Sequence, residues 1–347
     1  MKAIRFYQPG DVRLEEIEIP ETRVGEILVE VKATLTCGTD VKMYKRGHPM
    51  IKPPMTLGHE FAGTIAEIGE TTSSQFRVGD RVVSANSAPC NVCFFCKIGK
   101  PNLCENLEET LIGFSIDGSY AEYVRIPRRI VSQNTYKISE NISFEESSLL
   151  EPLACAVNGS DAANIGLGDT IAIIGSGPIG LMHLQLAKLK GASKIIVVDL
   201  NEDRLKLAAE IGADTTIDAD TAEKQLSQVK GLTKGLGADV VIEAVGLPQT
   251  WELAVKMTRK AGTTLFFGGC PSGSKVGVDT ELLHYGDLTL KGIFHHTPSS
   301  VMKAHKLIES GRFNGKPMIT DRVPLSKLEE SLLRMSRGEC VKIALLP

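Results

Sequence analysis

The stretch from Thr170 to Leu200, TIAIIGSGPIGLMHLQLAKLKGASKIIVVDL, limits the fold of this chain more than any other segment. Two apolar runs flank a glycine-rich turn and a helix-like segment. Runs that are apolar at successive positions are typical of strands buried on both faces, as in a parallel sheet covered by helices. The stretch therefore predicts a strand–helix–strand unit within an α/β fold.

The same rhythm continues along the chain. Further strands are predicted at Thr215–Ile217, Val240–Ala244, Thr263–Phe267 and Leu288–Ile293, and amphipathic helices at Arg204–Ile211, Trp251–Lys260 and Val301–Ser310. Six strands in this order make a doubly wound parallel sheet, the Rossmann arrangement. The last ~50 residues leave the pattern, and we expect them to return to the first domain.

The first 150 residues have a different texture. Short strand-like runs such as Ile27–Val31, Phe61–Ile68 and Arg81–Val83 are separated by glycine turns. They indicate an irregular antiparallel β domain. A length of 347 residues is enough for two domains with a core each.

The turn Gly175–Gly180 reads GSGPIG and directly follows a predicted strand. In a dinucleotide fold the first glycine allows the tight turn, Gly177 lets the backbone approach a pyrophosphate, and Gly180 lets the helix pack closely. Asp199 ends the next strand, where a carboxylate binds ribose hydroxyls and repels a 2′-phosphate. This predicts NAD rather than NADP, although the nearby Arg204 could accommodate the phosphate.

The predicted cofactor site comprises Gly175, Gly177, Pro178, Ile179, Gly180, Asp199, Leu200, Arg204, Val245 and Phe294. The alternative is a glycine turn in a sheet that binds nothing. The strand before the turn and the acidic residue after the second strand both favour the cofactor.

Four cysteines, Cys90, Cys93, Cys96 and Cys104, lie within fifteen residues as Cys-x2-Cys-x2-Cys-x7-Cys. Four thiolates at this spacing can surround one Zn²⁺ tetrahedrally at about 2.3 Å, which leaves no open position and predicts a structural zinc. The alternatives are reduced cysteines in a loop, two disulfides, or a nucleic-acid-binding zinc finger. The net charge of −3 argues against the last.

Composition excludes several further classes. A mildly acidic chain does not suit a general binder of nucleic acid or anionic membranes. The N-terminal MKAIRFYQPG has no signal-peptide pattern, and no run of about 18 apolar residues predicts a membrane span. Eight cysteines with a metal-like cluster fit a reducing cytoplasm.

Three other segments offer sulfur, nitrogen and oxygen ligands: Cys37-Gly38-Thr39-Asp40, Gly58-His59-Glu60 and Glu151-Pro152. Such a mixed set is typical of catalytic zinc. With LGHEFAGTI, the cysteine lobe, SLLEPLA and GSGPIG in order, the whole chain resembles the zinc-dependent medium-chain dehydrogenase/reductase family. Because of Glu151-Pro152, it is most similar to the sorbitol (polyol) and threonine dehydrogenase branch.

The resemblance implies a GroES-like catalytic domain, residues 1–152 and 294–347, with the structural zinc lobe at about 88–106. It implies a Rossmann NAD-binding domain at 153–293. It also implies two zinc ions per chain. Cys37 and His59 bind the catalytic one, and Glu60 and Glu151 complete its site, directly or through water. Neighbouring side chains of an extended strand point to opposite faces, so His59 and Glu60 can both ligate only if the backbone turns there.

The resemblance places the Thr39 hydroxyl beside the substrate oxygen and Phe114, His295 and His296 in the substrate pocket. Two positions depart from the family pattern. Lys42 stands where many relatives have a histidine, which affects the proton relay. Phe294-His295-His296 replaces an Arg-Tyr pair of sorbitol dehydrogenases, which suggests another substrate. Alternatively, the two histidines are solvated loop residues.

The expected function is zinc- and NAD-dependent oxidation of a secondary alcohol, a polyol or sugar alcohol, to a ketone. Alternatives within the branch are threonine 3-dehydrogenase and a 2,3-butanediol-type dehydrogenase. A non-catalytic nucleotide-binding regulator is the alternative from another class, but both metal sets and the glycine turn are present. The expected partner is a small alcohol, with no nucleic acid or membrane, and the resemblance implies a homodimer or homotetramer.

Overall fold

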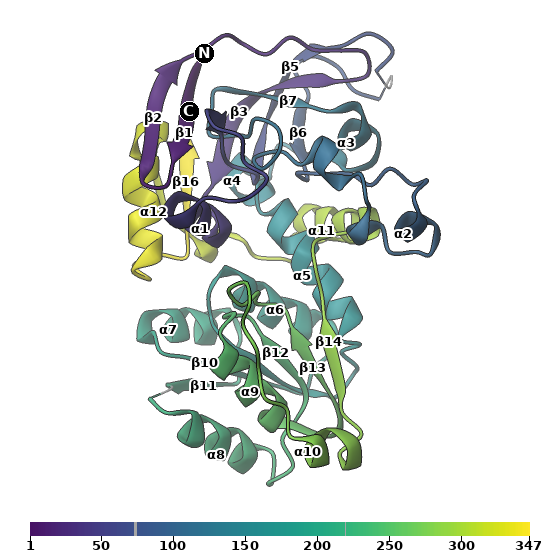
Figure 1. The fold of residues 1–347 in the computed structure, drawn as a ribbon, viewed down its shortest axis with the longest axis vertical. Coiled ribbons are helices and arrows are strands. Elements are labelled where there is room, and N and C mark those ends of the chain that lie inside the picture. Colours follow the sequence, from purple (N-terminus) through teal and green to yellow (C-terminus); the bar gives the residue numbers. More distant parts are fainter. Residues whose placement is uncertain (73–74, 219) are drawn as a thin grey trace. The chain divides into compact units, whose positions relative to one another are not determined.

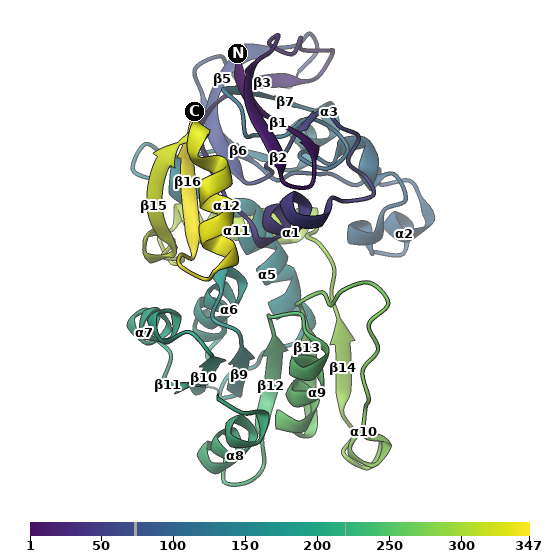
Figure 2. The same ribbon diagram turned by 60° about the vertical axis from the view of Figure 1, so that its left-hand side comes forward.

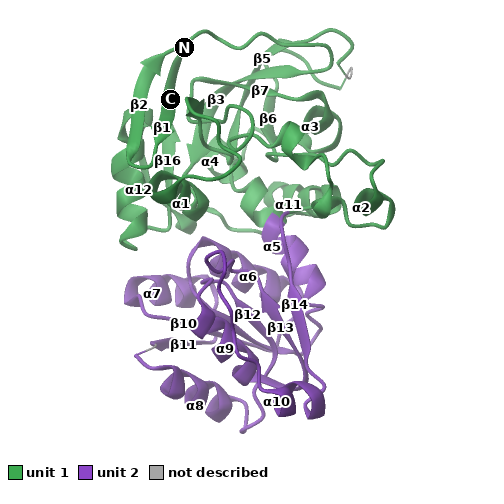
Figure 3. Ribbon diagram, viewed as in Figure 1, with its two compact units in different colours: residues 1–154, 296–347 green, residues 155–295 purple. Residues whose placement is uncertain are grey.

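A computed structural model describes residues 1–72, 75–218 and 220–347. It divides the chain into two compact units, residues 1–154 with 296–347, and residues 155–295 (Figure 3). The sequence predicted the boundaries at 152/153 and 293/294. Helix α5, Leu150–Ala162, contains the first boundary. No helix among the described residues is both long and apolar enough to cross a membrane.

The first unit is built on two sheets (Figure 1). A seven-stranded sheet has the order β15-β16-β3-β5-β6-β8, with β7 also pairing with β3, and a three-stranded sheet has the order β2-β1-β4. The strands are β1 (Lys2–Gln8), β2 (Asp11–Glu16), β3 (Ile27–Leu35), β4 (Met55–Thr56), β5 (Phe61–Ile68), β6 (Arg81–Ser84), β7 (Tyr123–Ile126), β8 (Thr135–Lys137), β15 (Ile319–Pro324) and β16 (Lys342–Leu346).

Short helices connect these strands. They are α1 (Gly38–Arg46), α2 (Phe94–Lys97), α3 (Arg128–Gln133), α4 (Phe144–Ser147), α11 (Pro298–Glu309) and α12 (Leu328–Ser336), with 3₁₀ turns at Pro101–Leu103, Leu107–Thr110, Lys316–Met318 and Leu325–Lys327. The core lies inside the curved sheet, where Val29, Phe61, Ile65 and Ile126 are almost fully buried. Antiparallel pairs dominate, as the sequence predicted.

The C-terminal segment, residues 296–347, belongs to the first unit. Strand β16 pairs antiparallel with the end of β3, with Ala344 opposite Leu35. Thr36 completes the joint, because its N–H donates to Ile343 O at 3.0 Å and its hydroxyl accepts from the Ile343 N–H at 3.0 Å. The chain end thus lies directly beside the segment that carries Cys37.

The second unit has the predicted six-stranded parallel sheet, in the order β11-β10-β9-β12-β13-β14 (Figure 2). Its strands are β9 (Thr170–Ile174), β10 (Lys194–Asp199), β11 (Thr215–Asp218), β12 (Ala238–Glu243), β13 (Thr258–Phe266) and β14 (Thr289–Gly292). Its helices after α5 are α6 (Pro178–Leu189), α7 (Glu202–Ile211), α8 (Ala222–Leu232), α9 (Pro248–Met257) and α10 (Thr280–Tyr285). The strand order reverses between β9 and β12, which is where such sheets bind ligands.

The predicted junction between a helix and the strand at Thr263–Phe267 is wrong in this unit. The helix predicted at Trp251–Lys260 ends at Met257, and Thr258 begins β13. Thr258 opposes Ala238 of β12, and its hydroxyl donates to Ala254 O at 2.9 Å. Threonine is β-branched and therefore favours a strand. Its hydroxyl here donates to a carbonyl at the end of the helix, which lets the helix stop at this point.

Candidate functional site

The glycine turn joins β9 to α6, and its three glycines differ in how much space surrounds them. Gly175 has φ +98°, and an added Cβ would lie 2.7 Å from Val245 Cγ2. At Gly180 a Cβ would lie 1.8 Å from the Gly175 carbonyl oxygen, so the helix packs directly on the turn. At Gly177 the nearest atom to an added Cβ is Arg204 Nη1 at 4.0 Å. Space for a ligand is therefore left at Gly177, with Pro178 beginning the helix.

Asp199 lies at the end of β10 and is bonded to the glycine turn. Its Oδ2 accepts from Ser176 N at 2.5 Å and from Ser176 Oγ at 2.7 Å. Its Oδ1 accepts from the N–H groups of Leu200 at 2.7 Å and Asn201 at 3.0 Å. The carboxylate is thus fixed beside the turn, in the position that a ribose-binding group requires.

Large apolar side chains stand exposed after the strands of this unit. Leu200 follows β10 and is 74% exposed, Val245 follows β12, and Phe294 follows β14 and is 61% exposed. Exposed apolar side chains at the carboxyl edge of a parallel sheet provide flat surfaces for the rings of a bound ligand. Ile179, by contrast, lies in the first turn of α6.

The four-cysteine lobe in the first unit brings its sulfur atoms together. One sulfur from each of Cys90, Cys93, Cys96 and Cys104 lies within 4.8 Å of the others. Backbone N–H groups point at two of them, from Cys90 to Cys104 Sγ at 3.2 Å and from Cys93 to Cys90 Sγ at 3.4 Å. All eight cysteines of the chain are described, and none of them forms a disulfide.

The four thiols of the lobe differ in acidity. A backbone hydrogen bond from Val92 lowers the pKa of Cys90 to about 6, whereas burial raises the pKa of Cys96 to about 12. Adjacent thiolates repel one another, so they cannot all ionise unless a cation joins them. The geometry and donor set of the lobe fit Zn²⁺, which favours tetrahedral thiolate coordination.

The second group of candidate ligands begins with Cys37, the N-cap of α1. The Thr39 N–H approaches the Cys37 sulfur at 3.4 Å, and Asp40 Oδ2 accepts from the Cys37 N–H at 3.0 Å. This reciprocal arrangement is a capping box with a thiol in place of a hydroxyl. It places the sulfur at the N-terminal end of the helix.

His59 and Glu60 lie between β4 and β5, outside regular strand structure. Gly58, just before them, has φ +91°. His59 and Glu60 could face the same ion only if the backbone turns between opposite strand faces, and the chain turns here. The candidate ligand atoms of Cys37, His59 and Glu60 all lie within 4.8 Å of one another. His59 is 3% exposed and Glu60 is fully buried.

A network of buried charges surrounds this group. His59 Nδ1 lies 3.3 Å from Asp40 Oδ1, and Lys342 forms an ion pair with Glu60 while donating to Thr36 O at 3.0 Å. Burial alone would lower the pKa of His59, but Asp40 and Cys37 raise it well above its usual value. Burial also opposes the charge of Lys342, whose pKa Glu60 raises above its usual value.

The group fits a catalytic metal ion. Among the described residues, the buried Glu60 Oε1 has no hydrogen-bond partner. Asp40 contacts one ring nitrogen of His59, and the other nitrogen could bind a metal, as in carboxylate–histidine–metal arrangements. One sulfur, one nitrogen and one oxygen are the mixed donors of a zinc site that keeps an open position.

Two of the predicted substrate residues lie near this group within the first unit. The half-buried Phe114 ring is 5.1 Å from the His59 ring, centre to centre, at an angle of 52°. Thr39 is in the first turn of α1, two residues from Cys37. Lys42 lies on the same helix and is exposed.

Glu151, His295 and His296 are not part of the close group formed by Cys37, His59 and Glu60. Glu151 is 7% exposed in the first turn of α5. His296 is 2% exposed, and its Nε2 lies 3.0 Å from Asn86 Oδ1, so the solvated-loop alternative is wrong for this residue. His295 belongs to the other unit, is half-buried, and has φ +60°; Asn158 Nδ2 donates to its carbonyl at 2.8 Å.

Three supporting residues were missed by the sequence prediction: Asp40, Tyr120 and Lys342. Asp40 is part of the CGTD segment, but its contact with His59 could not be read from sequence. A lysine within the apolar run VKIALLP was a usable signal, because a charge in a buried strand requires a partner. No local pattern marks Tyr120 as different from other buried aromatic residues.

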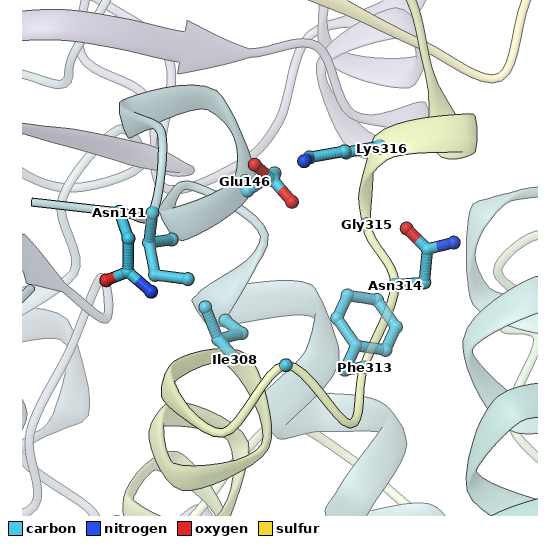
Figure 4. A pocket seen from close by; sticks show the side chains of 9 residues that line it. Asn141, Glu146, Ile308, Phe313, Asn314, Gly315 and Lys316 are labelled. Carbon is cyan, nitrogen blue, oxygen red and sulfur yellow. The ribbon is translucent and has the colours of Figure 1, made fainter. Parts of the chain in front are cut away.

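A cavity of about 310 Å³ in the first unit lies apart from these groups (Figure 4). Phe313 and Ile308 contribute apolar surface, while Glu146 and Lys316 point toward one another across it. Its described lining contains none of the residues predicted for the metal or cofactor sites.

Comparison with known proteins agrees with these features. Residues 23–136 match the alcohol dehydrogenase GroES-like domain, and residues 178–310 match the zinc-binding dehydrogenase domain. Sorbitol dehydrogenase of Bacillus subtilis is 31% identical over 100% of this chain and 97% of its own length. L-threonine 3-dehydrogenase of Caldanaerobacter subterraneus is 33% identical over 99% and 98%.

A solved structure gives the same result for the fold. It belongs to a protein from Sinorhizobium meliloti 1021 described as a zinc-binding dehydrogenase bound to NADP. It aligns with a TM-score of 0.90 and 31% identity over 100% of this chain and 99% of its own. The chain therefore belongs to the zinc-dependent medium-chain dehydrogenase/reductase family and is an oxidoreductase.

Proposed function

We propose that this protein is a zinc- and NAD-dependent dehydrogenase that oxidises a secondary alcohol, a polyol or sugar alcohol, to a ketone. The observation that supports this most strongly is the convergence of Cys37, His59 and Glu60 to within 4.8 Å. A dinucleotide-type glycine turn in the same chain provides for the second reactant.

Cys37, His59 and Glu60 would hold the zinc, with Glu151 able to replace or assist Glu60. When bound, zinc lowers the pKa of an alcohol oxygen and nicotinamide accepts the hydride from the carbinol carbon. Asp40 keeps the His59 ring oriented, and the Thr39 hydroxyl is available to carry the substrate proton outward. Phe114 lies beside His59, where its ring would limit the access of water.

The preferred cofactor is NAD, because Asp199 would meet a ribose 2′-phosphate with a negative charge. Arg204 Nη1 near Gly177 and the NADP bound to the Sinorhizobium relative make the preference worth measuring. Asp199→Ala should weaken NAD⁺ binding about tenfold and reduce discrimination against NADP⁺. Asp218→Ala is the matched control, since Asp218 is the neighbouring residue at the end of β11. A higher kcat/KM with NADP⁺ for the unaltered protein would overturn the preference.

Threonine oxidation is the second candidate, because the threonine and sorbitol dehydrogenases resemble this chain about equally. Absorbance of NADH should be followed with polyols, 2,3-butanediol, simple secondary alcohols and L-threonine as substrates. The polyol proposal requires the highest kcat/KM for a polyol. A clear preference for threonine or butanediol would replace the substrate while leaving the zinc chemistry intact.

His295 and His296 are proposed to set selectivity for the substrate. Because His295 has positive φ, His295→Asn is a better test than alanine, since asparagine tolerates this conformation. It should lower kcat/KM for the best polyol about 5- to 150-fold and spare 2-butanol. His296→Ala also removes the contact with Asn86, so it should lower stability as well as selectivity. Equal losses for both substrates in His295→Asn would remove His295 from the pocket.

We further propose a cytoplasmic homodimer or homotetramer. Described cysteines that form no disulfide suit a reducing compartment. Strand β14 is at one edge of its sheet, and Val92, Phe94 and Ile98 are more than half exposed on the cysteine lobe. Light scattering coupled to size exclusion will give the mass in solution, and a 37.5 kDa species would exclude stable assembly.

A further inference from the structure

Tyr120 is the largest fully buried side chain of the described residues, and it carries a hydroxyl into the interior. We propose that Tyr120 is a positioning residue that fixes the Cys37 segment and the His59 segment relative to one another, so that the catalytic set retains its metal. This inference rests on the proposed function, in which these two residues bind zinc. Tyr120 itself contacts neither the metal nor the substrate in this proposal.

The hydroxyl group of Tyr120 acts on the Cys37 segment through Asp40. It donates to Asp40 Oδ2 at 2.5 Å and lies 3.3 Å from the Leu35 carbonyl oxygen. The same Oδ2 accepts from the Cys37 N–H at 3.0 Å, and the other carboxylate oxygen lies 3.3 Å from His59 Nδ1. Asp40 therefore contacts both ligand residues, and Tyr120 supplies a side-chain bond that limits its rotation.

The ring of Tyr120 acts on the His59 segment through Gly58. A Cβ added at Gly58 would lie 2.8 Å from Cδ1 and 2.9 Å from Cγ of the ring. The Tyr120 N–H also donates to Leu57 O at 3.0 Å. The ring thus occupies the space beneath the residue that turns the chain into His59, while the hydroxyl reaches Asp40.

Because Tyr120 contacts both the Cys37 segment and the His59 segment, its removal should affect how firmly zinc is held. Hydrogen bonds to a carboxylate are among the stronger ones in proteins, especially in a dry interior. Partners that orient metal ligands typically change metal affinity or activity by about 10- to 100-fold. Because Tyr120 acts through Asp40, we expect the lower end of this range, an about tenfold faster loss of zinc when the hydroxyl is removed.

Tyr120→Phe removes the hydroxyl and keeps the ring under Gly58. Tyr44→Phe is its matched control, because Tyr44 donates to Glu329 Oε1 at the same 2.5 Å, is 8% exposed and lies on α1 with Asp40. Zinc release into an excess of a metallochromic chelator should be followed in the full-length protein. We expect two release phases, with only one accelerated about tenfold in Tyr120→Phe and neither in Tyr44→Phe.

A spectroscopic measurement separates a positioning role of Tyr120 from a general effect of the substitution on protein stability. With Co²⁺ in place of zinc, the visible bands of the mixed-ligand site should shift in Tyr120→Phe and remain unchanged in Tyr44→Phe, even where both lower Tm. Unchanged release and an unchanged spectrum in Tyr120→Phe, with two zinc ions bound, would overturn the positioning role alone. A wild-type protein that binds only the zinc of the cysteine lobe would instead overturn the proposed function.

Discussion

The cysteine lobe and the Cys37–His59–Glu60 group are two candidate metal sites of different construction in the same unit. The lobe takes four like ligands from fifteen consecutive residues, and none of its side chains except Cys104 is buried. The second group takes three unlike ligands from two separate loops and buries His59 and Glu60 almost completely. A local, closed site can stabilise the chain around it, whereas a buried, open site requires support from the rest of the unit.

The two groups also differ in the contacts that hold their candidate ligands in place. The lobe relies on backbone N–H groups that approach its sulfur atoms. The mixed group depends on side chains that are distant in sequence, with Asp40 and Tyr120 on one side and Lys342 on the other. Changes to the first site should therefore affect folding, and changes to the second should affect both metal binding and chemistry.

The largest expected effect is the loss of chemistry in Cys37→Ser. Removal of a thiolate ligand from an open zinc site should lower kcat/KM by at least about 1,000-fold, because the metal contributes several kcal/mol to the transition state. Metal analysis should show one zinc per chain instead of two, and circular dichroism should show a folded protein. An unfolded Cys37→Ser protein would contradict the proposal that one site serves chemistry and the other serves stability.

The next effect tests the buried ion pair. Lys342→Met leaves Glu60 without its cation inside the protein, which should cost about 3 to 5 kcal/mol of unfolding free energy in the metal-free protein. Adding Glu60→Gln should recover part of the loss, since the double variant buries no unpaired charge. Urea unfolding of the single and double variants measures the coupling. Strictly additive losses would show that Lys342 does not support Glu60.

Cys93→Ser should act on stability instead of chemistry. Opening the thiolate shell should lower the unfolding free energy by about 2 to 3 kcal/mol, with kcat within about threefold of the unaltered protein at a temperature where it is folded. Thermal unfolding and initial rates measure the two effects on the same sample. A fall in kcat as large as that of Cys37→Ser would make the lobe part of the catalytic machinery.

The smallest expected change in stability follows removal of metal from the unaltered protein. A chelator should take the zinc with three protein ligands before the zinc with four thiolates. Activity would then disappear while Tm falls by only about 2 °C, because the lobe remains closed. Release of the lobe zinc first, with a large fall in Tm and retained activity, would reverse the comparison.

The cysteine lobe and the parallel sheet are features that local sequence patterns predict well. The spacing of four cysteines and the apolar runs around GSGPIG predicted a thiol cluster and a strand–helix–strand unit, both of which the structure contains. Both depend on residues close in the chain, where spacing sets geometry. Even so, the helix end at Met257 was missed, since Thr258 begins a strand by pairing with Ala238, twenty residues earlier.

The mixed group illustrates the opposite case. The resemblance implied that Cys37, His59 and Glu60 are ligands. The turn at Gly58, which brings His59 and Glu60 close to Cys37, is a property of the folded chain. The prediction that Glu151 joins them stays open, because it lies outside their close group. His296 was predicted as a substrate contact, yet its bond to Asn86 spans 210 residues and no local pattern indicates it.

The sequence by itself determined the family, the two kinds of unit, the glycine turn and the residue types able to bind metal. These depend on periodicity, spacing and chemical identity, all of which are local. Only the tertiary structure decided which buried groups support the ligands, because Lys342 meets Glu60 across 282 positions and Tyr120 meets Asp40 across 80. Burial makes an unpaired charge or hydroxyl costly, so the fold that buries these groups must also pair them.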